Sequence, residues 1–244
     1  MRLFSLISLL LLFTSNSLPA QPTARQQLYH SFIACRMDQW GAIISEFEKN
    51  TSLDTENEKL EMVNYCYGYI GYLLGEKRLK DAEVYLKKGQ ELVDQIIEAN
   101  PHSAAAYAYK GAFLGFRIST DHSVALILGP SSAFYIKKAY QMNEQNIQCM
   151  IDRGNLYFYS PGFFGGDVNK AIRLYLQAVE KMEKTGESRE NWEYFNLLVL
   201  LAKAYDQAKK QNEAEQVYLK ILSIEPEFSW VKKELLPDLK KRMK

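Results

Sequence analysis

The sequence predicts an all-α fold, an α-solenoid of paired helices, and three observations indicate it. Apolar residues recur at spacings of three and four, valine is sparse, and the hairpin dipeptides Asn-Gly and Asp-Gly are absent, so the chain carries almost no strand signal. A small residue recurs inside four helical segments, as Gly68, Gly111, Gly154 and Ala202, with spacings of 43, 43 and 48 residues. A second helical segment follows each of them, which indicates a repeated helical hairpin.

The chain begins with a segment that has the composition of a secretory signal. Arg2 precedes an apolar run from Leu3 to Phe13, and small or polar residues lead to Ala20. Such a run is too short to span a membrane, so residues 1–20 predict a signal peptide that is cleaved within 17–20. We therefore expect an exported protein with no transmembrane segment in the mature chain.

The net charge of the chain argues against nucleic acid as a partner, and its cysteines and histidines argue against a CxxC pair and a metal site. Lys and Arg number 30 against 29 Asp and Glu, and 47% of the residues are hydrophobic, so the chain can form a large core. A net charge of +1 provides no basic surface for nucleic acid, and none is expected as a partner. Cys35, Cys66 and Cys149 form no CxxC pair, so we expect buried free thiols or one adventitious disulfide. The scattered histidines predict no metal site.

The helical repeat domain predicted at 21–228 divides into five hairpins in chain order. Residues 24–50 form a degenerate first hairpin, and Thr55 with Glu58 makes a capping box at the start of the next helix. The hairpins that contain the recurrent small residues lie near 58–100, 102–144, 147–184 and 192–228. An amphipathic segment at 229–244, with lysines on one face, predicts a C-terminal helix that caps the last hairpin.

The last hairpin carries a family resemblance at eight positions that are small, apolar, aromatic or proline: Leu198, Leu201, Ala202, Tyr205, Ala214, Tyr218, Ile221 and Pro226. Their spacing resembles the tetratricopeptide repeat (TPR), a unit of 34 residues. The resemblance implies a right-handed superhelix whose first helices line a concave groove for a protein or peptide. The first three full hairpins depart from the repeat by inserts of 2, 9 and 5 residues. The nine-residue insert, within 119–130, is apolar, and we expect it to form an ordered flap.

The groove positions of that resemblance give a set of candidate binding residues in this sequence. They are aromatic at the N-terminal end and polar at the C-terminal end: Tyr65, Tyr69, Tyr72, Asn155, Phe158, Lys203 and Asp206. Tyrosine suits a binding surface because it combines a rigid apolar face with a polar tip. The three tyrosines also share one helix face, a pattern that core packing produces as well. Groove and core therefore stay open as two interpretations of the tyrosines.

The five-residue insert carries the segment SPGFFGGD at 160–167. It lacks the spacing and the lysine-hydroxyl pair of a phosphate-binding loop, and its aspartate places negative charge where phosphate would lie. The loop instead has the layout of a turn, with a helix stop, two glycines expected at positive φ and an N-cap, which are Pro161, Gly165, Gly166 and Asp167. Phe163 and Phe164 are expected to pack back onto the repeats.

The same loop carries a second, narrower resemblance. The segment RGNLYFYSPGFFGGDVNKA at 153–171 resembles a hairpin of bacterial periplasmic TPR-like proteins, including those similar to the T component of TRAP transporters. This resemblance implies a periplasmic location. It also implies a periplasmic substrate-binding protein as partner, or a small hydrophobic ligand held in a channel.

Catalytic motifs are absent from the sequence. It contains no GxSxG, HExxH or CxxC motif, and Asp121 beside His122 has the pattern of a polar turn. The leading interpretation is an exported, non-catalytic scaffold that binds a protein or peptide in its groove and needs no cofactor. The alternative is a periplasmic transport accessory that holds a small apolar ligand among Tyr65, Tyr69, Tyr72 and Phe158. An enzyme of unrecognised type is the second alternative.

Overall fold

The computed structural model describes residues 22–243, and these residues form eleven α-helices and no strand. The predicted signal peptide at 1–20 lies outside the described residues. The helices are α1 (Ala24–Ile33), α2 (Trp40–Asn50), α3 (Glu56–Gly75), α4 (Leu79–Ala99), α5 (Ala104–Thr120), α6 (Ala125–Met142), α7 (Ile147–Tyr159), α8 (Val168–Thr185), α9 (Trp192–Gln207), α10 (Gln211–Ile224) and α11 (Leu236–Met243). The predicted all-α fold is confirmed.

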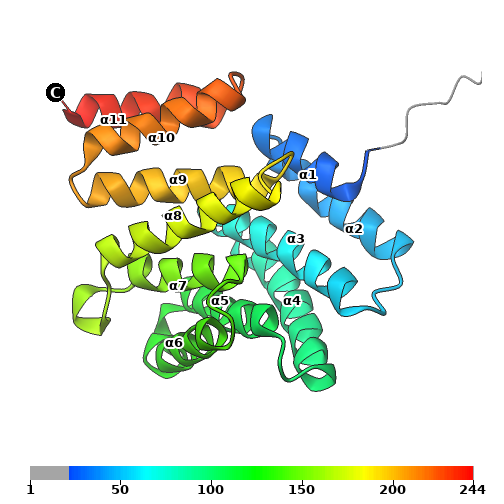
Figure 1. Ribbon diagram of the computed structural model, residues 1–244. Helices are drawn as coiled ribbons and strands as arrows, with labels where there is room; N and C mark the ends of the chain where they lie inside the picture. The colour runs from blue at the N-terminus through cyan, green and yellow to red at the C-terminus, as the bar shows by residue number, and fades with distance from the viewer. Residues whose placement is uncertain (1–21, 244) are drawn as a thin grey trace, which may run out of the picture.

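Consecutive helices pack against each other as hairpins (Figure 1). The pairs are α1 with α2, α3 with α4, α5 with α6, α7 with α8, and α9 with α10. One π-helical turn, Val231–Leu235, leads into α11, which packs on α10. Leu236 and Leu239 of this last segment are buried, whereas Lys240 and Lys241 are exposed. The C-terminal segment therefore caps the last hairpin, because it covers the apolar face that the next repeat would cover.

Polar side chains fix where several helices begin. The Thr55 hydroxyl accepts a hydrogen bond from the Glu58 backbone N–H at 3.2 Å, and the Glu58 carboxylate accepts one from the Thr55 N–H at 2.9 Å. This is the predicted capping box, and it pairs two backbone donors that the helix leaves free. Ser103, Asn146 and Asn191 cap α5, α7 and α9 in the simpler way, with a side-chain oxygen that accepts from the first turn.

The recurrent glycines lie where two helices approach closely. A Cβ atom on Gly111 would lie 2.9 Å from the Ser132 carbonyl oxygen and 2.9 Å from the Ile136 backbone nitrogen of α6. The Ser132 hydroxyl donates a hydrogen bond to the Gly111 carbonyl at 2.7 Å. Aromatic rings leave equally little room at Gly68 and Gly154. The recurrence at 43 residues therefore marks contacts between helices.

The nine-residue insert does not form a flap. Its residues lengthen both helices of the hairpin, so α5 continues to Thr120 and α6 begins at Ala125 after one 3₁₀ turn, His122–Val124. Helix α6 runs through Pro130, although proline usually ends a helix. An antiparallel pair of helices accommodates inserted residues without a longer loop when both helices become longer. Leu126 and Ile127 in the extension are 82% and 73% exposed.

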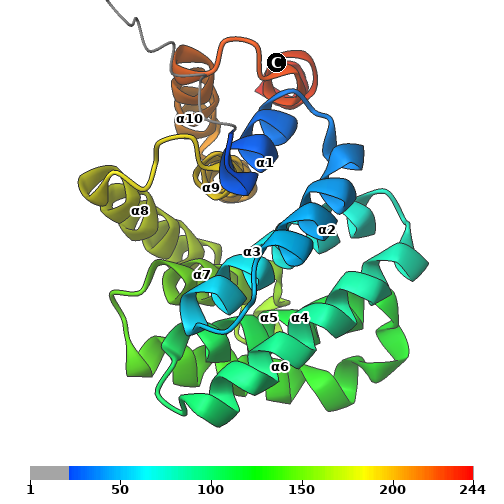
Figure 2. The ribbon, with the colours of Figure 1, turned by 90° about the vertical axis from the view of Figure 1, so that its right-hand side faces the viewer.

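The first hairpin packs against two others, the next hairpin in the chain through α3 and the last hairpin through α9. The ring of Phe32 on α1 lies 6.3 Å from that of Trp192 on α9, measured between centroids. Trp40 at the start of α2 lies 5.1 Å from Trp192 and 6.3 Å from Tyr69 on α3. Figures 1 and 2 both show α1 beside α9 and α2 beside α3. The solenoid therefore closes on itself, and its first and last hairpins share one core.

Candidate functional site

The tyrosines predicted for the groove lie mostly in the core. Tyr65 and Tyr69 are only 2% and 4% exposed. Phe47 of α2 packs edge-on against Tyr65, with ring centroids 5.2 Å apart, and Trp40 contacts Tyr69. Tyr72 is half-buried and stacks on Tyr69. The core interpretation therefore holds for Tyr65 and Tyr69, because the first hairpin occupies the helix face that an open groove would need.

Asn155 and Phe158 lie on the other side of α3. The Asn155 side-chain N–H donates to the Tyr67 hydroxyl at 3.0 Å, and its oxygen accepts from the Tyr175 hydroxyl at 2.7 Å. Phe158 packs edge-on against Tyr175. Because Tyr67 is two residues from both Tyr65 and Tyr69, it points to the opposite side of the helix. The structure therefore does not assemble the ligand pocket expected from Phe158 and the three candidate tyrosines.

Lys203 and Asp206, at the other end of the candidate set, contact the C-terminal segment. The Lys203 ammonium lies 5.0 Å from the centroid of the Trp230 ring, and burial lowers the pKa of Lys203. The Asp206 carboxylate accepts a hydrogen bond from Arg242 at 2.8 Å. Both side chains therefore help to hold the terminal cap. The seven candidate residues thus lie in three separate places.

A buried polar network lies between α3, α7 and α8. Asp152 is 1% exposed and accepts hydrogen bonds from the Tyr67 hydroxyl at 3.0 Å and from the Gln148 amide at 2.8 Å. Asn155 links Tyr67 to Tyr175 beside it. Burial raises the pKa of Asp152 to about 7, although these donors favour the charged form.

A second carboxyl group joins this network from α9. The Asn64 amide donates to the Tyr109 hydroxyl at 2.9 Å and to the Glu193 carboxylate at 3.0 Å. Burial, and then the charge of Asp152, raise the pKa of Glu193 to about 7. The rings of Tyr67 and Tyr109 meet edge-on at 5.6 Å and connect the two halves. The two carboxyl groups of this network therefore change protonation near neutral pH.

The network can bind and release protons, and it also links five helices, α3, α5, α7, α8 and α9. The sequence contains a weak signal for it, because Asp152 stands between the buried residues Ile151 and Gly154 on an apolar helix face. Glu193 lies 41 residues further on. A search for paired carboxylates on one helix therefore misses the pair.

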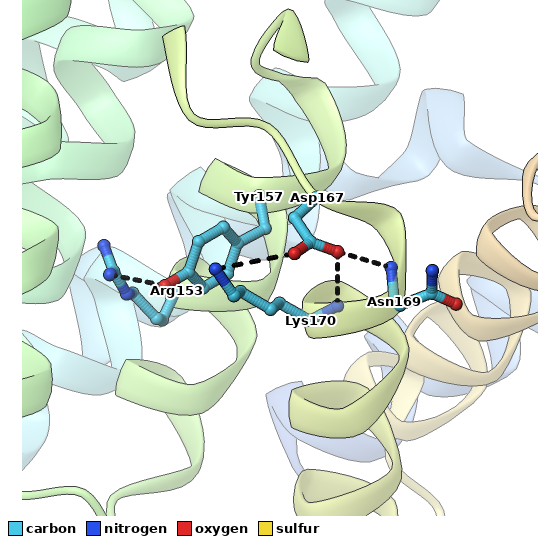
Figure 3. A network of polar contacts seen from close by, with 5 residues as sticks. All are labelled: Arg153, Tyr157, Asp167, Asn169 and Lys170. Carbon is cyan, nitrogen blue, oxygen red and sulfur yellow. Dashed lines mark hydrogen bonds and ion pairs between the residues drawn. The ribbon is translucent and has the colours of Figure 1, made fainter. Parts of the chain in front are cut away.

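The loop at 160–167 confirms part of its predicted layout. Gly165 has φ of +88°, in the left-handed region, and the Asp167 carboxylate accepts from the backbone N–H groups of Asn169 and Lys170 (Figure 3). Asp167 is therefore the N-cap of α8, as predicted. Pro161 follows α7, which ends at Tyr159.

Two expectations for this loop are wrong. Gly166 has no positive φ, and its requirement for glycine comes from close approach, because a Cβ there would lie 1.9 Å from the Ser160 carbonyl oxygen. Phe163 and Phe164 do not pack back onto the repeats, since they are 83% and 68% exposed. The short 3₁₀ turn Gly162–Phe164 turns both rings away from the helices.

The cysteines form no disulfide in the described part of the chain. Cys66 and Cys149 are buried, and burial raises the pKa of each thiol to about 12, so neither forms a reactive thiolate at neutral pH. Cys35 is exposed, contrary to the expectation of three buried thiols.

Residues 22–243 contain no helix that is both long and apolar enough to cross a membrane. No group of three or more histidine, cysteine or acidic side chains in that range is arranged to hold a metal ion.

Comparison with known proteins relates the chain to others by its fold. No protein-family model matches the sequence, and no curated protein matches it. The crystal structure of a thermophilic TPR protein from Thermus thermophilus superposes with a TM-score of 0.51. The match covers 89% of this chain and 94% of that chain at 16% sequence identity. The chain therefore has the TPR-like all-α solenoid fold that the spacing of its small residues predicts.

Proposed function

We propose that this protein is an exported, non-catalytic scaffold that binds a protein partner. The TPR-like solenoid supports a role in protein interaction, because such folds present extended surfaces rather than enclosed catalytic centres. The composition of residues 1–20 supports export, and the resemblance of the segment at 153–171 favours the bacterial periplasm.

The observation that carries the proposal is an apolar surface at the tips of two neighbouring hairpins. We call it the hairpin-tip surface, and its members are Leu126, Ile127, Tyr159, Phe163 and Phe164. Helices α5 and α7 pack side by side and run in the same sense, since each is antiparallel to α6 between them. The connections that follow α5 and α7 therefore lie at the same edge of the molecule.

Exposure sets this surface apart from the tyrosine set. Phe163, Leu126 and Ile127 are each more than 70% exposed. Large apolar side chains gathered on a surface mark sites of protein contact, because their burial against a partner is favourable by roughly 25 cal/mol per Å². The two longer inserts, of nine and five residues, both contribute residues to the surface. The proposed binding site is therefore the hairpin-tip surface rather than a groove lined by Tyr65 and Tyr69.

The test uses the mature chain as bait for proteins of the exported fraction of its native cells. The double variant Phe163→Ser and Phe164→Ser removes two rings from the surface. The control Val84→Ser and Ile224→Ser removes two exposed apolar side chains on α4 and α10. We expect equal melting temperatures for all three proteins, because none of these side chains belongs to the core.

A partner that is captured by the wild type and the control should be lost with the tip variant. With the purified partner, the dissociation constant should rise about tenfold or more for the tip variant, since central aromatic contacts contribute most of the binding energy. Capture that is equal for all three proteins would rule out this surface. A chain that stays in the cytoplasmic fraction of those cells would rule out export, and one that retains residues 1–17 would contradict cleavage within 17–20.

A further inference from the structure

A pocket of about 470 Å³ opens between α6, α7 and α8. Four cations from the three helices line it, against a single carboxylate, that of Glu144: Lys137, Arg153, Lys170 and Arg173. Tyr140 and Tyr157 add aromatic faces to the wall. The volume lies within the range of small-molecule sites, about 300 to 1,000 Å³. It shares no lining residue with the hairpin-tip surface.

Arg153 has hydrogen-bonding capacity that the chain does not use. One terminal nitrogen, Nη2, donates to the Tyr157 hydroxyl at 2.7 Å, and the guanidinium lies 4.4 Å from the centroid of that ring. The other, Nη1, is buried and finds no partner among the described residues. A guanidinium offers five N–H donors, and a buried donor without an acceptor costs about 1 to 3 kcal/mol. Because Nη1 is buried, an anion in the pocket would accept from it only after a small movement of the Arg153 side chain, which would then gain its missing acceptor.

The loop that precedes α8 positions Lys170 beside the Tyr157 ring, which Arg153 also contacts. The Lys170 ammonium lies 5.4 Å from the centroid of the Tyr157 ring and 3.5 Å from the Asp167 carboxylate (Figure 3). The Asp167 backbone N–H also donates to the Tyr157 carbonyl at 3.0 Å. The N-cap of α8 thus places one cation beside the tyrosine that Arg153 already contacts.

The remaining cations of the pocket form no ion pair within the described residues. Neither Lys137 nor Arg173 forms an ion pair with any residue between 22 and 243, and the same holds for Arg153. Elsewhere, lysines pair across neighbouring helices, as Lys110 does with Asp94 at 2.9 Å. The pocket therefore concentrates positive charge in a chain whose net charge is only +1.

We propose that this pocket binds a small, non-peptide organic anion that carries at least two carboxylate or phosphate groups. The planar fork of Arg153 or Arg173 can donate two parallel hydrogen bonds to one such group, and the lysines can hold the other. The tyrosine faces provide contact for the carbon skeleton between them. One anionic group would leave part of the positive charge unbalanced, so a polyvalent ligand fits better. This site is independent of partner binding at the hairpin-tip surface.

The experiment measures binding of two probes, citrate and inorganic pyrophosphate, to the mature chain by isothermal titration calorimetry. We expect one site for at least one probe. Arg173→Gln and Lys137→Gln should each raise the dissociation constant about tenfold, because a hydrogen bond to a charged group is worth about 1.5 to 3 kcal/mol. Both side chains are exposed, so the variants should fold. Arg153→Gln should weaken binding further.

The control is Lys87→Gln on α4, which makes the same change in net charge far from the pocket. This control should bind the probes as the wild type does. At about 0.15 M salt the Debye length is about 8 Å, so a charge far from the pocket is largely screened. Equal weakening by the control would show non-specific attraction and overturn the proposal. Failure of both probes to bind would also overturn it. A capped triglutamate peptide that binds where the two probes do not would overturn it in favour of an acidic protein segment.

Discussion

At the scale of single residues, the Asp152 carboxyl group shows how burial and hydrogen bonding compete. Removal from water favours the neutral acid, whereas Tyr67 and Gln148 donate to the charged form. Burial has the larger effect, so the pKa rises to about 7 from about 3.9 for an unperturbed aspartic acid. Between these two values the folded chain holds a proton that the unfolded chain has released. Folding is therefore more favourable at low pH, and this contribution is lost as the pH rises through about 7.

The pH dependence of stability gives the first prediction. Asp152→Asn removes the buried acid of the network, and the asparagine amide can keep a hydrogen bond to Tyr67. Between about pH 5 and about pH 8, the melting temperature of the wild type should fall more than that of the variant. Each kcal/mol by which the two losses of stability differ should appear as about 2 to 4 °C in the melting temperature. Thermal unfolding followed by circular dichroism measures both slopes.

Glu193 and the exposed acids set the background of this measurement. Glu193 has a raised pKa with the same sign, so the variant should keep part of the slope. Asp167 and Asp238 have pKa values lowered by hydrogen bonds, which give the opposite sign below about pH 5. The control Glu46→Gln on α2 should melt with the slope of the wild type. Identical slopes for the wild type and Asp152→Asn would contradict the assignment of a raised pKa to Asp152.

At the scale of elements, the α5 and α6 hairpin depends on one close approach. Gly111 brings the two backbones together, and four residues further along α5 Gly115 faces open space except for the Ser132 hydroxyl at 3.7 Å. The two glycines lie on one helix face one turn apart. They therefore form a matched pair in which only one position requires glycine.

This pair gives the second prediction. Gly111→Ala should lower the free energy of unfolding by about 1 to 3 kcal/mol, because the methyl group would overlap backbone atoms of α6. Gly115→Ala should leave it unchanged or raise it by about 0.5 to 1 kcal/mol, since alanine favours a helix more than glycine does. Urea unfolding of both variants gives the two values. A loss of stability at Gly115 equal to that at Gly111 would show that close approach does not explain the recurrence.

The helices were largely predictable from local patterns, and the inserts were not. Apolar spacing, Thr55 with Glu58, and Asp167 mark helix starts within a few residues, and such signals are local by nature. The apolar insert within 119–130 suggested a flap, but its residues extend α5 and α6, and α6 runs through Pro130. Gly166 suggested a positive φ angle, whereas the cause is the position of Ser160, which depends on how the whole loop folds.

At the scale of the whole molecule, closure of the array decides which surfaces remain. The first hairpin covers Tyr65 and Tyr69, and Trp192 of the last hairpin packs against Trp40. These partners are 152 residues apart in the chain. No local pattern reports such a contact, so the sequence could not choose between a tyrosine groove and a tyrosine core. The sequence did not predict the cationic pocket for the same reason, because its four cations come from three helices.

Closure gives the third prediction. Phe32→Ala removes a ring that lies between Trp192 and Phe228, and it should lower the free energy of unfolding by about 3 to 5 kcal/mol. Amide hydrogen exchange should then accelerate in α1 and α2 and also in α9 and α10, while α5 and α6 keep their protection. Phe134→Ala, at a 60% exposed position on α6, is the control and should change neither. Faster exchange confined to α1 and α2 would argue against a shared core.

The contact between the first and last hairpins also has an evolutionary consequence. An open solenoid gains or loses repeats by duplication or deletion, because each unit touches only its two neighbours. Here an added hairpin would separate α1 from α9 and expose the aromatic side chains that they now share. We therefore expect descendants of the same ancestor to vary the lengths of their inserts, as the α5–α6 and α7–α8 hairpins do, and to keep the number of hairpins at five.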